Sequence, residues 1–152
     1  MSFWAYAMGE PKSIIDRDNG TIILRSSMYP KGGCEWVIAG DTIVQNEFKR
    51  KGVASETIQI SEISELTLDL GKISGDLRIW GNRPKLWVRP LPFSAPDMFV
   101  AYEAYMYILA KRLELSQEPL KQNLSPVLVG MKQQLDNGEL DKEALRAKGV
   151  HF

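Results

Sequence analysis

Residues 94–115 carry the longest helical pattern in the sequence, and this pattern follows a series of short strand patterns. Ser94 can cap the first turn, and Asp97 stands where a carboxylate can reach back to the cap. Lys111 and Arg112 near the end suit the negative pole of the helix dipole. Apolar side chains recur at spacings of three and four residues, which predicts a single buried stripe of Met98, Tyr102, Tyr105, Met106, Leu109 and Leu113. Because such stripes are usually core, we expect the helix to pack on a sheet.

The first strand patterns lie in the N-terminal third. Residues 21–26 (TIILRS) are rich in β-branched side chains and predict a strand. Residues 35–48 predict a hairpin around the two-residue turn Gly40-Asp41. The cross-strand pairs that follow from this turn are Trp36–Gln45, Val37–Val44 and Ile38–Ile43. The sequence leaves open which face of this hairpin is buried.

More strand patterns follow a charged loop at residues 49–52. Residues 56–60 predict a short strand. Residues 63–70 predict a strand with one buried face, because leucine alternates with polar residues there. Residues 76–89 predict a second hairpin across a four-residue turn at residues 81–84.

Prolines separate these strands from the helix, and we expect Pro90, Pro92 and Pro96 to end the sheet. Short strands upstream of one amphipathic helix favour an α+β fold. We expect a small antiparallel sheet that curls, or a partly open barrel, closed by the long helix.

The second hairpin holds the first candidate binding surface. Pairing across its four-residue turn puts polar and aromatic side chains on one face, namely Asp76, Arg78, Trp80, Lys85, Trp87 and Arg89. The aliphatic side chains Leu77, Ile79, Leu86 and Val88 then face the core. Exposed Trp and Arg are typical interface anchors, so Arg78, Trp80, Lys85, Trp87 and Arg89 are candidate partner-binding residues. The alternative is that cation–π stacking of these side chains only stabilises the hairpin.

The charged loop holds the second candidate surface. Lys49, Arg50 and Lys51 are three adjacent cations that could meet the phosphate of an anionic lipid headgroup. The alternative is an ordinary solvated hairpin end.

The composition limits the classes of protein that fit. A chain of 152 residues is long enough for one domain with a real core. Its 19 basic and 19 acidic residues give no net charge, so we expect no nucleic-acid partner. One cysteine cannot form an internal disulfide, no apolar run is long enough to span a bilayer, and the first residues do not resemble a signal peptide. We therefore expect a cytoplasmic protein.

No arrangement of residues points to catalysis, a cofactor or a metal. The only histidine is His151, next to the C-terminus. Cys34 has no neighbouring histidine, so it is interpreted as a structural cysteine. We expect a non-enzyme without cofactor or metal, and we keep a small-molecule enzyme working in the groove between sheet and helix as a third hypothesis.

The sequence changes character after Leu115. Residues 116–125 predict a polar linker. Residues 127–135 predict a short helix that stops at Asn137-Gly138, and Asp141 can cap a last short helix. Residues 126–152 are therefore expected to form a short helical hairpin, which must dock on another surface to be stable.

The order of these elements resembles bacterial pleckstrin-homology-like domains. The resemblance covers about residues 21–115 and rests on the segment TIQISEISELTLDL, where Ile58, Ile63, Leu66 and Leu68 match the family pattern of a strand crossing the sheet. It implies a domain over residues 1–115 in which the helix closes the barrel.

The tail resembles the C-terminal helical hairpin called SHOCT. The residues in matching positions are Leu135, Gly138, Asp141, Glu143 and Lys148. Together the two resemblances imply a non-catalytic module for protein–protein interaction or self-assembly. The alternative is a membrane-surface adaptor that binds anionic headgroups through Lys49, Arg50 and Lys51.

Overall fold

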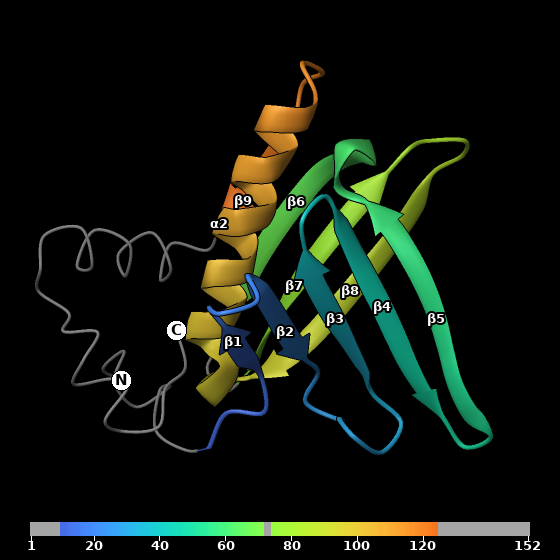
Figure 1. Ribbon diagram of the computed structural model, residues 1–152, viewed down its shortest axis with the longest axis vertical. Coiled ribbons are helices and arrows are strands. Elements are labelled where there is room, and N and C mark those ends of the chain that lie inside the picture. The colour runs from blue at the N-terminus through green and yellow to red at the C-terminus, as the bar shows by residue number, and fades with distance from the viewer. Residues whose placement is uncertain (1–9, 72–73, 125–152) are drawn as a thin grey trace, which may run out of the picture.

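The computed structural model describes residues 10–71 and 74–124, and this part of the chain is an α+β fold of two sheets and one α-helix (Figure 1). The five-stranded sheet is antiparallel throughout, with its strands in sequence order. Its strands are β1 (Ile14–Asp16), β2 (Thr21–Arg25), β3 (Cys34–Ala39), β4 (Thr42–Lys49) and β5 (Gly52–Gln59). The short 3-10 helix η1 (Ile60–Glu62) leads into the second sheet.

The four-stranded sheet has the order β8-β7-β6-β9. Its strands are β6 (Ile63–Leu70), β7 (Ser74–Gly81), β8 (Trp87–Ser94) and β9 (Lys121–Leu124). β9 runs parallel to β6, whereas the other pairs are antiparallel. The two sheets do not join into a closed barrel within the described residues.

The hairpin of β3 and β4 has the predicted register, with Trp36 opposite Gln45 and Ile38 opposite Ile43. The structure also decides its buried face. Trp36, Ile38 and Ile43 are fully buried, and the indole Nε1 of Trp36 donates to Oε1 of Gln45 at 2.8 Å. Burying the indole is therefore compatible with satisfying its N–H.

Two other strand predictions are confirmed in part. β6 buries every second residue from Leu66 to Leu70, as the alternation predicts. β5 is longer than expected, because it begins at Gly52 and pairs with β4 along its whole length. Only Arg50 and Lys51 of the predicted loop remain as an unpaired turn.

Helix α2 (Met98–Leu115) follows the 3-10 turn η2 (Ala95–Asp97) and packs against β6, η1 and β2. Figure 1 shows it along one side of the molecule, next to β2 and β6. Its buried residues together with the inner faces of both sheets form one hydrophobic core. Met98, Tyr102 and Tyr105 are buried as predicted.

Three details of the helix differ from the prediction. Leu113 is 55% exposed, and the residue before it, Arg112, is buried instead. The Ser94 side chain makes no capping hydrogen bond. Asp97 turns away from the helix end, and its Oδ1 accepts from the backbone N–H groups of Lys12 and Ser13.

Two of the three prolines do not end the sheet, whereas Pro96 lies in η2, just after β8. Pro90 and Pro92 lie inside β8, which is an edge strand and can therefore accommodate residues without an N–H. Four residues of the predicted linker form β9. The predicted helical hairpin at residues 126–152, with His151, lies outside the described residues. In the described ranges, no helix is long and apolar enough to cross a bilayer.

Candidate functional site

The hairpin of β7 and β8 has a register different from the predicted one. The observed pairs include Trp80–Val88, Arg78–Pro90 and Gly81–Trp87. Each β7 residue thus pairs three positions further along β8 than expected. Side chains alternate between faces, so an odd shift moves every β8 side chain to the other face. The prediction of one shared face is therefore wrong for Arg78, Trp80, Lys85, Trp87 and Arg89.

The core explains the shift. The connection between the strands is residues 82–86, one residue longer than predicted, and β8 extends to Ser94. Leu91 and Phe93 are fully buried opposite Leu77 and Gly75. Burying Leu91 and Phe93 removes more apolar surface from water than burying Leu86 and Val88, which the sequence predicted to face the core.

The outer face of the hairpin and the end of its connection carry exposed apolar side chains. Leu86 is 75% exposed and Val88 is 42% exposed. Trp80, directly opposite Val88, is half-buried, and the Arg78 guanidinium lies 5.6 Å from the Trp80 ring centroid. Pro90 continues this face as the partner of Arg78. We call Arg78, Trp80, Leu86, Val88 and Pro90 the hairpin surface.

The inner face holds the other predicted residues. The Trp87 ring packs against Gly81, where it leaves no room for a Cβ, and its Nε1 donates to the carbonyl of Arg83 at 3.2 Å. The Arg89 guanidinium lies 5.8 Å from the Trp87 ring centroid. Lys85 lies in the connection and lines, with Trp87 and Arg89, a cavity of about 230 Å³ beside β5.

Arg89 is occupied by an ion pair that links the two sheets. Its Nε and Nη2 donate to the two carboxylate oxygens of Glu56, each at 2.8 Å. The hydrogen bonds from Arg89 lower the pKa of Glu56, and those to Glu56 raise the pKa of Arg89. Arg89 therefore joins β8 to β5, whereas the Arg78 guanidinium donates to the Asp76 carboxylate of its own strand at 2.6 Å.

The predicted headgroup-binding residues lie at the tight turn between β4 and β5. Lys49 pairs with Gly52, and Lys49, Arg50 and Lys51 are all exposed. We call these three residues the basic turn. The next side chain, Val53, is 58% exposed. Within residues 10–71 and 74–124, the basic turn makes no salt bridge.

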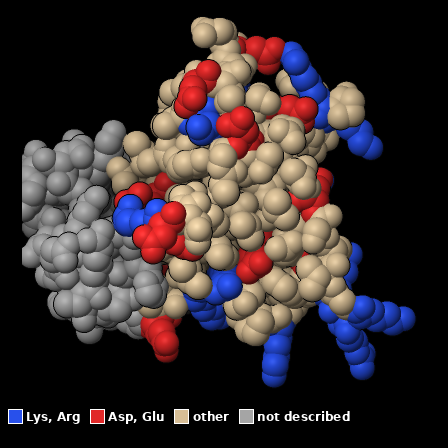
Figure 2. All heavy atoms as spheres, in the orientation of Figure 1, with Lys and Arg blue, Asp and Glu red and all other residues tan. Residues whose placement is uncertain are grey.

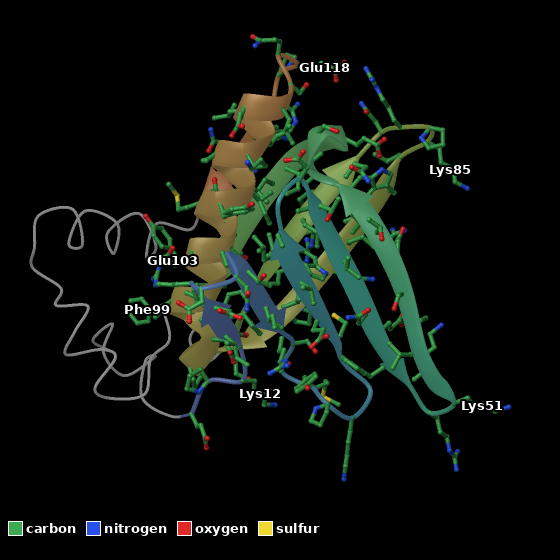
Figure 3. The ribbon with its side chains drawn as sticks, in the orientation of Figure 1. Lys12, Lys51, Lys85, Phe99, Glu103 and Glu118 are labelled. Carbon is green, nitrogen blue, oxygen red and sulfur yellow. The ribbon has the colours of Figure 1, made fainter. Side chains whose placement is uncertain are left out.

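The two candidate surfaces are far apart. Figure 3 shows Lys51 at the lower end of the molecule and Lys85 at the opposite end. Figure 2 shows several Lys and Arg side chains projecting from that lower end. Met28, in the loop between β2 and β3, is 63% exposed.

Cys34 lines a cavity of about 300 Å³ with Gln45, Glu47 and Pro90. Burial raises the pKa of the Cys34 thiol, which reduces its thiolate fraction at neutral pH. No group of three or more His, Cys, Asp or Glu residues that could hold a metal ion occurs among the described residues.

The largest cavity described, about 400 Å³, lies between α2 and the turn joining β1 to β2. Asp16 is one of its acidic residues. Its carboxylate accepts from the side chain of Asn19 at 2.7 Å, and this hydrogen bond lowers its pKa. Asp16 therefore stabilises the turn between β1 and β2, and it is a poor candidate for a general base at neutral pH.

Sequence reasoning missed Leu86, Val88 and Pro90 as surface residues. A signal for them was present, because Pro90 and Pro92 alternate with Leu91 and Phe93. Prolines facing out and large apolar residues facing in are typical of an edge strand with one buried face.

Comparison with known proteins identifies no family, since no protein-family model, curated protein or solved structure matches the chain.

Proposed function

We propose that the chain is a non-catalytic protein-interaction module and that a protein partner docks on the hairpin surface. The proposal rests on the observation that Leu86 and Val88 are 75% and 42% exposed, beside the half-buried ring of Trp80. Exposed apolar side chains that adjoin Trp and Arg are typical of the anchors of protein interfaces.

The order of elements supports the pleckstrin-homology-like part of this proposal. Four meandering strands (β2 to β5) are followed by three (β6 to β8) and then by α2. Among the described residues, α2 packs mainly against β6, η1 and β2, and Leu86 and Val88 of the hairpin surface stay exposed. The SHOCT-like tail, as a second interaction element, belongs to the same proposal.

The test uses the full chain with a photo-crosslinking amino acid at position 86 or at position 113. Leu113 is the matched control, because it is 55% exposed but lies on α2. We expect a protein from the host to crosslink at position 86 and not at position 113. The crosslinked protein, once purified, should bind the Leu86→Ser/Val88→Ser variant at least about tenfold more weakly than the wild type.

Two results would contradict the proposal. One is equal crosslinking at positions 86 and 113. The other is unchanged affinity in Leu86→Ser/Val88→Ser while circular dichroism shows an intact fold.

The second candidate function is binding of anionic lipid headgroups by the basic turn. Its support is the juxtaposition of three exposed cations with the exposed side chain of Val53. Cations attract an anionic surface, and an exposed aliphatic side chain can enter the headgroup region.

Cosedimentation with phosphatidylserine vesicles tests this second function. Because each cation near such a surface contributes about 1 kcal/mol, reversing Lys49, Arg50 and Lys51 to Glu should weaken binding at least about tenfold. Lys85→Glu, at the other end of the molecule, is the control and should bind almost like the wild type. Binding that is equal on neutral phosphatidylcholine vesicles would rule out headgroup recognition.

A further inference from the structure

The two sheets have four edges, and three of them are short or blocked. β1 has three residues and β9 has four. β8 has eight, but it contains two prolines. β5, the fourth edge, has eight residues and no proline. Natural proteins usually protect exposed sheet edges against further pairing. A long edge without such protection can form backbone hydrogen bonds with another strand.

The backbone of β8 is closed to a further strand. The Pro92 carbonyl accepts from the Ser27 N–H at 3.0 Å. This bond shows that the even-numbered residues of β8 direct their backbone N–H and C=O groups away from β7. Pro90 and Pro92 therefore remove two of the outward donors. The Arg89 side chain donates to the outward carbonyl of Val88 at 2.8 Å.

The backbone of β5 is open. The Ile60 N–H donates to the Asp41 carbonyl at 3.0 Å, which continues the ladder between β4 and β5. In an antiparallel ladder the bonded residues alternate, so the odd-numbered residues of β5 direct their N–H and C=O groups outward. These residues are Val53, Ser55, Thr57 and Gln59, and all four are exposed. Within the described residues, β5 has no neighbour on that side.

We propose that β5 pairs antiparallel with β5 of a second copy of this chain, about a two-fold axis at Ser55. This register matches outward residues with outward residues, as backbone pairing requires. Val53 then lies opposite Thr57, and Ala54 lies opposite Glu56. No like charges face each other, and the five-stranded sheets of two copies become one continuous sheet.

Charge complementarity favours a second copy over another partner. In this register, the basic turn of one copy lies beside residues 59–61 of the other, next to Glu62. Glu62 is exposed there and makes no salt bridge within the described part of the chain. The two-fold axis repeats the contact, so both basic turns gain a carboxylate and both Glu62 side chains gain a cation.

Sedimentation of the full chain tests the pairing. We expect a monomer–dimer equilibrium with a Kd on the order of 10–100 µM, in the range of small interfaces. In Ser55→Lys or Ser55→Glu alone, like charges meet at the two-fold axis, and each variant should be monomeric. An equimolar mixture of the two variants should form a heterodimer, whereas Ser55→Ala should dimerise like the wild type.

Three results would overturn the proposal. A wild type that stays monomeric at about 1 mM would exclude a specific interface. Dimerisation of either charged variant as strong as that of the wild type would place the interface elsewhere. A mixture that stays monomeric would exclude this register. The hairpin-surface variant Leu86→Ser/Val88→Ser should dimerise normally, so failure here and failure of the proposed function can be told apart.

Discussion

Arg112 is the largest buried polar side chain of the described region, with 1% of its surface exposed. Its Nε donates to the carbonyl of Ile63 at 2.6 Å, and its terminal nitrogens donate to carbonyls of the segment that follows α2, including Glu118 at 3.1 Å. It makes no salt bridge within residues 10–71 and 74–124. Arg112 therefore ties the end of α2 to the start of β6 and to the chain leading into β9.

We predict that Arg112→Ala lowers the free energy of unfolding by about 2–4 kcal/mol, because it leaves several carbonyls without a donor. Urea unfolding measures this loss. Lys111→Ala is the neighbouring control, since Lys111 makes only surface ion pairs at 3.4 and 3.9 Å and should lose less than about 1 kcal/mol. Equal losses in the two variants would contradict the role given to Arg112.

Asp97 is the second buried polar residue with a structural role, with 1% of its surface exposed. Its Oδ1 accepts from the N–H groups of Lys12 at 2.9 Å and Ser13 at 2.7 Å, whereas its Oδ2 is buried without a hydrogen-bond partner. Burial raises the pKa of Asp97, and the hydrogen bonds from Ser13 and Lys12 oppose this rise only in part.

A raised pKa in the folded state gives Asp97 a defined effect on stability. Its stabilising contribution is fully present below the unfolded-state pKa of about 3.9 and is lost as pH rises through the folded-state pKa. We predict that the wild type loses stability over this window relative to Asp97→Asn, which keeps the Oδ1 acceptor and does not titrate. Urea unfolding of both proteins as a function of pH measures the difference. A difference that is constant, or that grows in favour of the wild type with rising pH, would contradict the prediction.

At the level of elements, the pairing of β7 with β8 decides which side chains are available. The observed register puts Trp80 and Val88 directly opposite each other, whereas Arg78 and Trp87 lie on different faces. Engineered cysteines can distinguish this register from the one predicted across a four-residue turn, because a disulfide requires adjacent Cβ atoms.

We predict that Trp80→Cys/Val88→Cys forms an intramolecular disulfide on oxidation, in a Cys34→Ser background. Arg78→Cys/Trp87→Cys in the same background is the control and should retain two free thiols. Thiol titration and mass spectrometry of the oxidised monomer measure both outcomes. The reverse result would restore the predicted register and with it a continuous Trp and Arg face.

At the level of the whole molecule, the ion pair of Arg89 with Glu56 connects two sheets that, within the described residues, do not close into a barrel. Glu56 is 45% exposed in this pair, so solvent screens much of the attraction. A double-mutant cycle of Arg89→Ala and Glu56→Ala should give a coupling of no more than about 1 kcal/mol, and less in high salt.

The pH dependence of this coupling follows from the lowered pKa of Glu56. The contribution is present above the unfolded-state pKa of about 4.3 and is lost as pH falls through the folded-state pKa. Urea unfolding of the four proteins at pH 7 and at acid pH measures the loss. Coupling that persists unchanged in acid would contradict a charge-dependent interaction, because the packing of Arg89 on Trp87 cancels in a double-mutant cycle.

The proposed dimer also bears on membrane binding. In that dimer the basic turn of each copy lies close to Glu62 of the other copy, which neutralises part of its charge. Vesicles that bind through the basic turn should therefore favour the monomer. Sedimentation in the presence of vesicles would compare the two modes directly.

Local sequence patterns are sufficient to predict the elements whose partners are close in the chain. The two-residue turn at Gly40-Asp41 sets the pairs of β3 and β4, and alternation predicts the buried face of β6. The helical spacing predicts α2, with Met98, Tyr102 and Tyr105 in the core. Local geometry and periodicity are sufficient in these cases because turn type and side-chain spacing are properties of a few neighbouring residues.

Features that depend on partners far away in the chain could not be predicted from local patterns. The register of β8 follows from burial of Leu91 and Phe93, and the buried position of Arg112 follows from carbonyl acceptors as far away in sequence as Ile63. β9 exists because β6 offers an unpaired edge to the segment after the helix. Competition between burial and hydrogen bonding across the whole core settled these features, and this competition separated the predicted tryptophan and arginine face into two surfaces.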